Sequence, residues 1–366
     1  MIGRNENGLP EREYIMPQNG TVRTVLDGLF YSGAHRLLAP FVQGIGSFLM
    51  LHHVRPSADK NGFAPNAGLE ITPEFLDTVL NHFKEREIEF VSFAEGIRRT
   101  KLGVSPKSFA VFTLDDGYLD NFEHAWPVFK RHDCPFTLFI ASDITDGTSE
   151  LWWQILEQAI AASNSLSAEI AGETISCKTA TAVQKRQAYE NLYKRVRWGL
   201  EEQEQRKWIR SFAELQGIDV HAHCRAQAMT WDQVREINED PLCTIGAHTV
   251  HHYAVGRMSE EDAYLEMLLS RGRIAEELGA APDYFCYPYG DEISAGSRDF
   301  GLAKKAGFEA AVTTRKGMIY PEHAEHLLAL PRVSLNGAFQ HVRYVDVLMS
   351  GLPFMLANKF RSVNAA

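Results

Sequence analysis

The sequence lacks paired cysteines. Its five cysteines lie far apart and include no CxxC pair: Cys134, Cys177, Cys224, Cys243 and Cys286. An odd number of cysteines at such spacings argues against a disulfide framework and against a zinc site built from thiolates. Free thiols are typical of proteins in a reducing compartment, so we expect a cytoplasmic location.

The chain also lacks an excess of positive charge and a long apolar run. It has 37 Lys and Arg against 47 Asp and Glu, a formal net charge of −10, without a basic cluster. This balance argues against a nucleic-acid partner. Residues 1–20 have no apolar core of the secretory type, and polar residues such as Asp27 and Arg36 interrupt 21–51. A spanning helix needs about 20 nearly uninterrupted apolar residues, so we expect no transmembrane segment.

What the chain has is ample apolar material in short runs. Hydrophobic residues make up 45% of its 366 residues, enough for a large core, and continuous apolar runs are typical of strands buried on both faces. Segments whose apolar residues follow a helical spacing lie between these runs, and this alternation predicts a parallel α/β architecture. The predicted strands are 47–52, 90–92, 108–114, 136–141, 244–247, 284–287, 310–314 and 330–335. The predicted helices are 22–42, 72–85, 93–100, 118–132 and an amphipathic segment at 345–360.

The alternation stops between about residues 151 and 227. This stretch is charged, follows a helical spacing and shows no strand runs, which predicts an inserted helical subdomain at one side of the main domain. We therefore divide the chain into an N-terminal arm with an amphipathic helix (1–44), a main domain that carries the insertion (45–340), and a C-terminal amphipathic segment (341–366). The sequence says nothing about the oligomeric state.

Two adjacent carboxylates follow the strand predicted at 108–114. Asp115 and Asp116 precede Gly117, and parallel α/β folds place functional groups at the carboxyl ends of their strands. Because neighbouring side chains diverge there, one carboxylate can bind a metal while the other stays free as a base. Asp and Gly also favour ordinary turns, and for this tripeptide alone the turn is the commoner explanation.

Histidines follow the strand predicted at 244–247. His248 and His252 are four residues apart in HTVHH, so on a helical turn both imidazoles would lie on one face. Two histidines, one carboxylate and an open position form a common catalytic zinc arrangement. A loop that is rich in histidine by chance is an equally good explanation of this motif alone. A third turn, Tyr287-Pro288-Tyr289-Gly290, ends another predicted strand and by itself indicates no more than a turn.

Three segments of the chain resemble the three motifs of the polysaccharide deacetylase family, also called NodB-homology or chitooligosaccharide deacetylase-like. In chain order these segments are TLDDGYLDN, GAHTVHH and FCYPYGD. The resemblance covers roughly residues 45–337, with 151–227 as an insertion. FxYPYG is similar to the branch that acts on polymers like poly-N-acetylglucosamine. The resemblance implies a distorted (β/α) barrel of the TIM-like type, with the site at the carboxyl ends of the strands.

The resemblance also implies roles for the motif residues. Asp115 would be the general base, and Asp116, His248 and His252 would bind a divalent metal, zinc first, with cobalt or nickel as alternatives. The backbone N–H of Tyr289 would help hold the oxyanion, an interaction worth about 3 kcal/mol per donor. Bound zinc lowers the pKa of a water ligand to about 7, which provides a nucleophile for an acetamide carbonyl.

The chain departs from the family pattern at two positions. Many members carry an arginine two residues before the third motif's proline, where this chain has Cys286, and the usual C-terminal LxxH is replaced by Leu330-Pro331-Arg332-Val333. We expect Arg332 to take the place of the missing arginine and orient Asp115, because its planar fork can grip one carboxylate oxygen. His52, at the end of the first strand, is a candidate additional site residue. A structural histidine at a strand end is as good an explanation.

The resemblance favours a hydrolase that removes N-acetyl groups from N-acetylglucosamine units of an oligo- or polysaccharide, for instance a chitooligosaccharide or an exopolysaccharide precursor. An N-acetylated glycan is therefore the expected partner. Trp152 and Trp153, which open the insertion, are candidate platforms for a sugar ring, although such pairs more often belong to the core. One alternative is hydrolysis of another C–N bond, in a cyclic amide or ureide. Another is a sugar-binding barrel without turnover.

Overall fold

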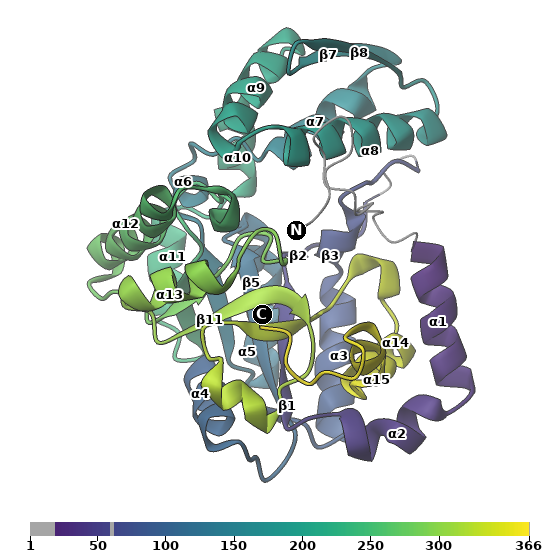
Figure 1. Ribbon diagram of the computed structural model, residues 1–366, viewed down its shortest axis with the longest axis vertical. Helices are drawn as coiled ribbons and strands as arrows, with labels where there is room; N and C mark the ends of the chain where they lie inside the picture. Colours follow the sequence, from purple (N-terminus) through teal and green to yellow (C-terminus); the bar gives the residue numbers. More distant parts are fainter. Residues whose placement is uncertain (1–18, 59–61, 366) are drawn as a thin grey trace.

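The centre of the computed structural model, which describes residues 19–58 and 62–365, is a closed barrel of seven parallel strands (Figure 1). Around the barrel the strands follow the order β1, β12, β11, β10, β9, β6 and β5, and β5 pairs with β1 to close the ring. The short β4 pairs with the start of β5. The expected distorted (β/α) barrel is confirmed.

Each predicted strand lies within two residues of its expected position. The barrel strands and β4 are β1 (Gly46–Leu51), β4 (Glu89–Phe90), β5 (Phe109–Asp116), β6 (Phe136–Ile140), β9 (Cys243–Ala247), β10 (Tyr284–Cys286), β11 (Ala310–Lys316) and β12 (Leu330–Ser334). The flanking helices are α3 (Pro73–Glu85), α4 (Phe93–Leu102), α5 (Trp126–His132), α6 (Ser142–Thr145), α11 (Trp231–Asn238), α12 (Glu260–Leu278) and α13 (Ser297–Lys305). A two-stranded sheet of β2 (His53–Val54) and β3 (Glu70–Ile71) follows β1. The helix expected at 118–132 is a π-turn over Asn121–Ala125 that continues into α5.

Alternation along β5 decides which side chains reach the barrel interior. Ala110, Phe112 and Leu114 belong to the core between strands and helices, whereas Phe109 and Val111 pack in a separate cluster with residues of β1, β6, β10, β11 and β12. Because side chains alternate along a strand, Asp115 falls on the same side as Phe109 and Val111. A carboxylate is thereby buried inside the barrel.

The insertion stands over one end of the barrel in Figure 1 and has a core of its own. It consists of α7 (Trp152–Ala162), β7 (Ser165–Ile170), β8 (Glu173–Lys178), α8 (Ala182–Gly199), α9 (Glu202–Leu215) and α10 (Val220–Gln227). The expectation that this stretch holds helices only is wrong, because β7 and β8 form an antiparallel hairpin that does not join the barrel. Alternate residues of β7 are buried, a period of two that the charged surroundings concealed.

Helices at both ends of the chain pack together beside the barrel. They are α1 (Asn19–Tyr31), α2 (Ala34–Val42), α14 (Val342–Met349) and α15 (Leu352–Ala357). The single helix expected at 22–42 is broken at Gly33, which has a positive φ of 73°, and Gly351 (φ 76°) divides the C-terminal segment in the same way. Residues 1–18 of the N-terminal arm lie outside the described residues. No helix in the described part of the chain is both long and apolar enough to span a membrane.

The closure of the barrel gives a stability prediction. A Cβ at Gly46 would overlap the ring of the fully buried Phe109 at the β1–β5 contact, whereas Gly28 in α1 has no neighbour within 4 Å. Gly46→Ala should therefore lower the free energy of unfolding by about 1–3 kcal/mol through overpacking. Gly28→Ala, the matched control, should raise it by about 0.5–1 kcal/mol. Denaturant midpoints of the two variants would measure the difference, and equal midpoints would contradict this account of closure.

Candidate active site and metal centre

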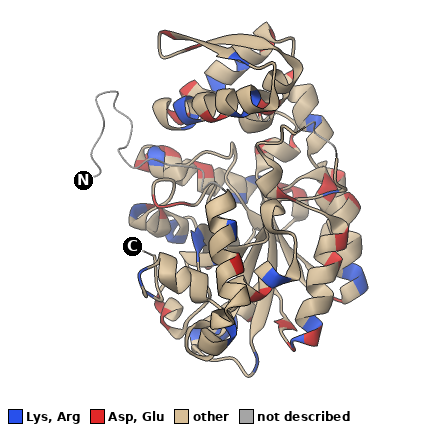
Figure 2. Ribbon diagram, turned by 90° about the vertical axis from the view of Figure 1, so that its right-hand side faces the viewer, with Lys and Arg blue, Asp and Glu red and all other residues tan. Residues whose placement is uncertain are grey.

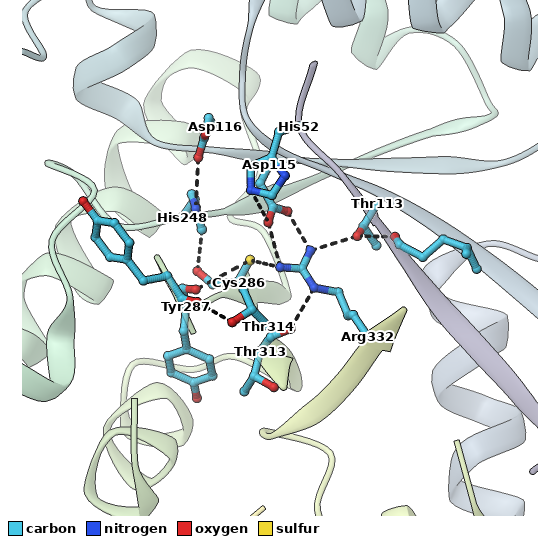
Figure 3. A network of polar contacts seen from close by, with 12 residues as sticks. His52, Thr113, Asp115, Asp116, His248, Cys286, Tyr287, Thr313, Thr314 and Arg332 are labelled. Atoms are coloured by element: carbon cyan, nitrogen blue, oxygen red, sulfur yellow. Dashed lines mark hydrogen bonds and ion pairs between the residues drawn. The ribbon is translucent and has the colours of Figure 1, made fainter. Parts of the chain in front are cut away.

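The motif residues converge where β5, β9 and β10 end (Figure 3). Asp115 and Asp116 are the last two residues of β5, His248 follows β9 directly, and Cys286 ends β10. All four are buried. Because parallel strands end at the same edge of a barrel, three segments that are far apart in the sequence meet at one point.

Asp116, His248 and His252 present three potential ligand atoms to one another, all within 4.8 Å. The Nε2 atoms of His248 and His252 lie 3.2 and 3.1 Å from the same Oδ1 of Asp116. Neither contact has the geometry of a hydrogen bond, since this oxygen is buried without a hydrogen-bond partner among the described residues. Two imidazole nitrogens close to an unsatisfied carboxylate oxygen give three lone-pair donors, an arrangement that a cation stabilises.

The dimensions and the tautomer of His248 fit a tetrahedral metal. Bonds of about 2.0–2.2 Å to nitrogen and oxygen separate ligand atoms by about 3.3–3.5 Å, close to the separations of 3.1–3.2 Å. His248 donates its Nδ1–H to the Cys286 carbonyl over 2.7 Å, which leaves the Nε2 lone pair free for a cation. The residues present therefore fit a divalent metal.

A second group, Asp115, His248 and Cys286, also brings three potential ligand atoms together. Both oxygens of Asp115 and the sulfur of Cys286 already accept hydrogen bonds from the guanidinium of Arg332. A cation there would lie next to a fixed positive charge, which disfavours it. The Asp116 group is therefore the better metal centre.

Arg332 lies inside the barrel and binds Asp115 through both of its terminal nitrogens. Nη1 donates to Oδ1 and Nη2 to Oδ2, each over 2.7 Å (Figure 3). The sequence led us to expect a grip on one oxygen only, so the bidentate geometry is a correction. Each carboxylate oxygen has two lone pairs, so Asp115 can still accept a proton or a further hydrogen bond.

The remaining N–H groups of Arg332 are also satisfied. Nε donates to the Thr313 carbonyl over 2.8 Å, Nη1 to the Thr113 hydroxyl over 3.0 Å and Nη2 to the Cys286 sulfur over 3.2 Å. Burial by itself would raise the pKa of Asp115, but the charge and hydrogen bonds of Arg332 outweigh burial and hold the pKa below its usual value. Asp115 is thus an ionised carboxylate in a fixed orientation.

His52 lies next to this pair, at the end of β1. Its Nε2 is 3.8 Å from Oδ2 of Asp115, and its side chain is 18% exposed, unlike the other residues of the site. Burial lowers the pKa of His52 against the opposing effect of Asp115, so the ring is neutral at neutral pH and can accept a proton. The structure brings this candidate to the site, while His53 turns away and bonds Asp120 over 2.7 Å.

Tyr289 lies on the other side of the metal centre. Its ring is 4.9 Å from that of His252, and its backbone has a positive φ of 59°. Thr314 donates a hydrogen bond to the Tyr289 carbonyl, whereas no acceptor for the Tyr289 N–H occurs within residues 19–58 and 62–365. The N–H is therefore available to a ligand, as the predicted oxyanion role requires.

Two buried charged side chains that sequence reasoning missed fix the HTVHH loop. Glu266 of α12 accepts hydrogen bonds from the N–H groups of Val250 and His251, both over 3.0 Å. Arg206 of α9 donates to the carbonyls of His251 and His252 over 3.1 and 3.2 Å. The loop is held from both sides, and one of the two supports comes from the insertion. No motif in the sequence marks these partners, because they are distant in the chain.

Trp152 and Trp153 are buried, with exposed fractions of 0% and 6%, so neither offers a face to solvent. Trp152 donates its Nε1–H to the Tyr289 hydroxyl over 2.9 Å, and the ring of Trp153 lies 5.0 Å from that of His252. Trp153 Nε1 is a buried donor with no partner in the described part of the chain. The pair belongs to the wall of the site and is not a solvent-facing sugar platform.

Comparisons with known proteins agree with this geometry. A sequence profile of the family described as polysaccharide deacetylase matches residues 103–311. Among solved structures, the deacetylase PplD of Streptococcus pyogenes, solved in complex with acetate, is similar over 83% of this chain and 97% of its own, with 17% identity and a TM-score of 0.55. IcaB of Ammonifex degensii is similar over 84% and 97%, with 18% identity and a TM-score of 0.52. A de-N-acetylase of Aggregatibacter actinomycetemcomitans is similar over 82% and 99%, with 15% identity and a TM-score of 0.51. At these identities the structures show a shared fold. No curated protein sequence matched the chain.

The metal centre predicts opposite effects for the two adjacent aspartates. Asp116→Ala removes one of three ligand atoms and should abolish binding of one equivalent of zinc. Asp115→Asn, its neighbour and control, keeps the three ligands and should retain the metal. Metal analysis of the purified variants after dialysis against zinc would measure both. Equal metal content in wild type and Asp116→Ala would rule out this centre.

The loop supports predict an effect on metal affinity without loss of a ligand. Glu266→Gln keeps the size of the side chain but weakens its two bonds to backbone N–H groups, and it should lower zinc affinity by about 10–100-fold, the usual effect of a residue that orients a ligand. Glu261→Gln, an exposed position on the same helix, is the matched control. Competition with a chromophoric chelator gives both affinities, and identical affinities would contradict a positioning role for Glu266.

Proposed function

The chain belongs to the polysaccharide deacetylase family and is a carbohydrate N-deacetylase, and from this premise we propose that it removes acetyl groups from N-acetylglucosamine units of an oligo- or polysaccharide. The observation that carries the proposal is an oriented carboxylate, Asp115, beside a group of three potential metal ligands that begins at the next residue, Asp116. A sugar-binding barrel without turnover would have no need for a buried carboxylate held ready beside a metal.

The family is generally metal-dependent, and Asp116, His248 and His252 would hold the metal in this chain. We propose zinc, whose preference for nitrogen and oxygen ligands suits two imidazoles and one carboxylate, with cobalt or nickel as functional substitutes. When bound, such a metal supplies Lewis-acid polarisation of an oxygen and makes hydroxide available at neutral pH. These residues would leave at least one coordination position open.

The chain's own residues divide the remaining work. Asp115 takes the proton of the attacking water, and Arg332 keeps its carboxylate ionised and aimed. The Tyr289 N–H donates to the oxyanion that develops from the acetamide carbonyl. His52 is another titratable group beside Asp115, and we propose that it receives the proton that Asp115 takes from the water and passes it to the leaving amine. This assignment fills the place of the absent LxxH histidine.

We also propose a cytoplasmic location, which would make a biosynthetic intermediate, such as a chitooligosaccharide or an exopolysaccharide precursor, the natural substrate. The five cysteines are free thiols, and Cys134, Cys224 and Cys286 are buried. The Cys286 thiol accepts a hydrogen bond from Arg332 in the centre of the site, and a free thiol at such a position is typical of a reducing compartment. Fractionation of cells that produce the protein would test the location.

Acetate release tests the proposed reaction. Wild type loaded with zinc should release acetate from N-acetylglucosamine oligomers, and removal of the metal by a chelator should abolish release. Asp115→Asn should lower kcat by about 100-fold or more while zinc stays bound, the usual loss for a general base. Arg332→Lys keeps the charge but not the bidentate fork and should also lower kcat. Release from a cyclic amide or ureide, without release from any N-acetylated sugar, would overturn the proposal.

A further inference from the structure

A cavity of about 850 Å³ lies beside the active site, between the barrel and the terminal helices. Met50 of β1 and Arg332 and Ser334 of β12 line it on the barrel side. On the opposite side it is lined by α1, through Val22 and its neighbours, and by residues of α15. This volume is within the range of cavities that hold small organic ligands.

The lining of the cavity is largely hydrocarbon. Apolar side chains come from α1, α14 and α15 and from two shorter segments: Val22, Val25, Leu26, Leu69, Phe339, Leu348, Phe354 and Leu356. Some belong to its walls, such as Leu26, which is buried, whereas Val25 and Leu356 are 51% and 46% exposed and place apolar surface at its rim. A lining of this kind stabilises an apolar ligand by removing both surfaces from water.

Charged residues near the cavity have both signs. Lys194 and Lys316 contribute to the lining together with Asp291 and Glu292. Arg315, also in the lining, donates to the carbonyls of Asn364 and Ala295 over 2.6 and 2.9 Å. The cationic residues Lys194, Arg315, Lys316 and Arg332 outnumber Asp291 and Glu292 in this lining. Asp115 neutralises Arg332, and the apolar wall is the larger part of the surface that a ligand would contact.

Two residues of the lining, Arg332 and Trp198, connect the cavity to the residues of the active site. Arg332, which lines it, is the residue that orients Asp115. Trp198, also in the lining, stacks against the guanidinium of Arg197 at 4.4 Å, and the same guanidinium lies 3.9 Å from the ring of Tyr289. A substrate whose acetamide lies between Asp115 and Tyr289 therefore has the cavity within reach of its remaining part.

The apolar character continues on the surface beside the cavity. Helix α2, which packs against α15, exposes Leu37 and Phe41 by 76% and 82%, and Phe360 is 68% exposed. Figure 2 looks toward the side formed by α1 and α2. In a chain with a net charge of −10, residues 352–365 carry Lys359 and Arg361 and no acidic residue. Helices α1, α2 and α15 lie outside the matched stretch 103–311.

We propose that the substrate is an N-acetylated sugar joined to a hydrocarbon chain, and that this chain occupies the cavity between β1, β12, α1 and α15. The inference rests on the proposed deacetylation and adds the class of substrate to it. A free polysaccharide would leave the apolar wall in contact with water. A lipid-linked sugar would cover that wall, and the exposed apolar residues Leu37 and Phe41 lie on α2, which packs against α15.

A pair of substrates that differ only in the aglycone tests this proposal. Di-N-acetylchitobiose with a dodecyl group should show a KM lower by about tenfold or more than the methyl glycoside, below the micellar concentration, with a similar kcat. Calorimetry with zinc-free protein measures binding of the same two glycosides without turnover. Equal KM values and equal affinities would overturn the cavity proposal while acetate release still supports the deacetylase.

Variants at the rim give the matched control. Leu356→Glu places a charge at the rim and should remove the advantage of the dodecyl glycoside without changing kcat or KM for the methyl glycoside. Leu215→Glu, on α9 and 81% exposed, should change neither. An equal loss in both variants would overturn the proposal. So would binding of sugar-free phosphatidylglycerol vesicles that depends on Leu356 without any dodecyl advantage, since the occupant would then be a bilayer lipid.

If neither glycoside releases acetate, the proposed function fails, yet the calorimetric comparison still decides the cavity. Tighter dodecyl binding that Leu356→Glu abolishes and Leu215→Glu preserves would support an apolar-chain site in a protein of another activity. The two proposals therefore fail by different measurements.

Discussion

The buried ion pair of Arg332 and Asp115 is the interaction on which the site depends. A guanidinium inside a barrel has a large desolvation cost, which is offset only when its charge and all its N–H groups find partners. Asp115 and Thr113 of β5, the Thr313 carbonyl of β11 and Cys286 of β10 provide them. The pair thus ties β5, β10, β11 and β12 together at the mouth of the barrel. Loss of either partner would leave an uncompensated buried charge.

This pair also explains how two adjacent aspartates do different chemistry. Arg332 neutralises Asp115 and binds both of its oxygens, which favours a metal at Asp116, whose Oδ1 has no such partner in the described structure. The backbone around the metal site is strained. Asp116, Thr249, His252 and Tyr289 all have positive φ, a conformation that L-residues rarely adopt. Such strain persists only where the surroundings fix the backbone, and Arg206 and Glu266 do so for the histidine loop.

Sequence reasoning reached the barrel and the motif residues because both have local signals. Apolar runs mark buried strands, and a strand end followed by Asp-Asp-Gly or His-Thr-Val-His-His marks a site. It missed the β7–β8 hairpin, where surrounding charge obscured the alternation, and the helix breaks at Gly33 and Gly351, where the apolar spacing continues although the backbone turns at a positive φ. It placed Arg332 beside Asp115 by a resemblance, but no pattern could reveal the bidentate grip, since that is fixed by three-dimensional register.

The insertion and the terminal helices contribute differently from the barrel. The barrel strands and the segments directly after them carry Asp115, Asp116, His248, His252 and Tyr289, the residues to which we assign the chemistry. The insertion contributes Arg206, which binds the carbonyl of His252, and Trp153, whose ring lies beside that of His252. The insertion therefore supports the HTVHH loop as well as covering it. The helices α1 and α15 line an apolar cavity together with Arg332. If shared barrel residues determine which bond is broken, these additional elements are the part of the chain that can determine which sugar is brought to it.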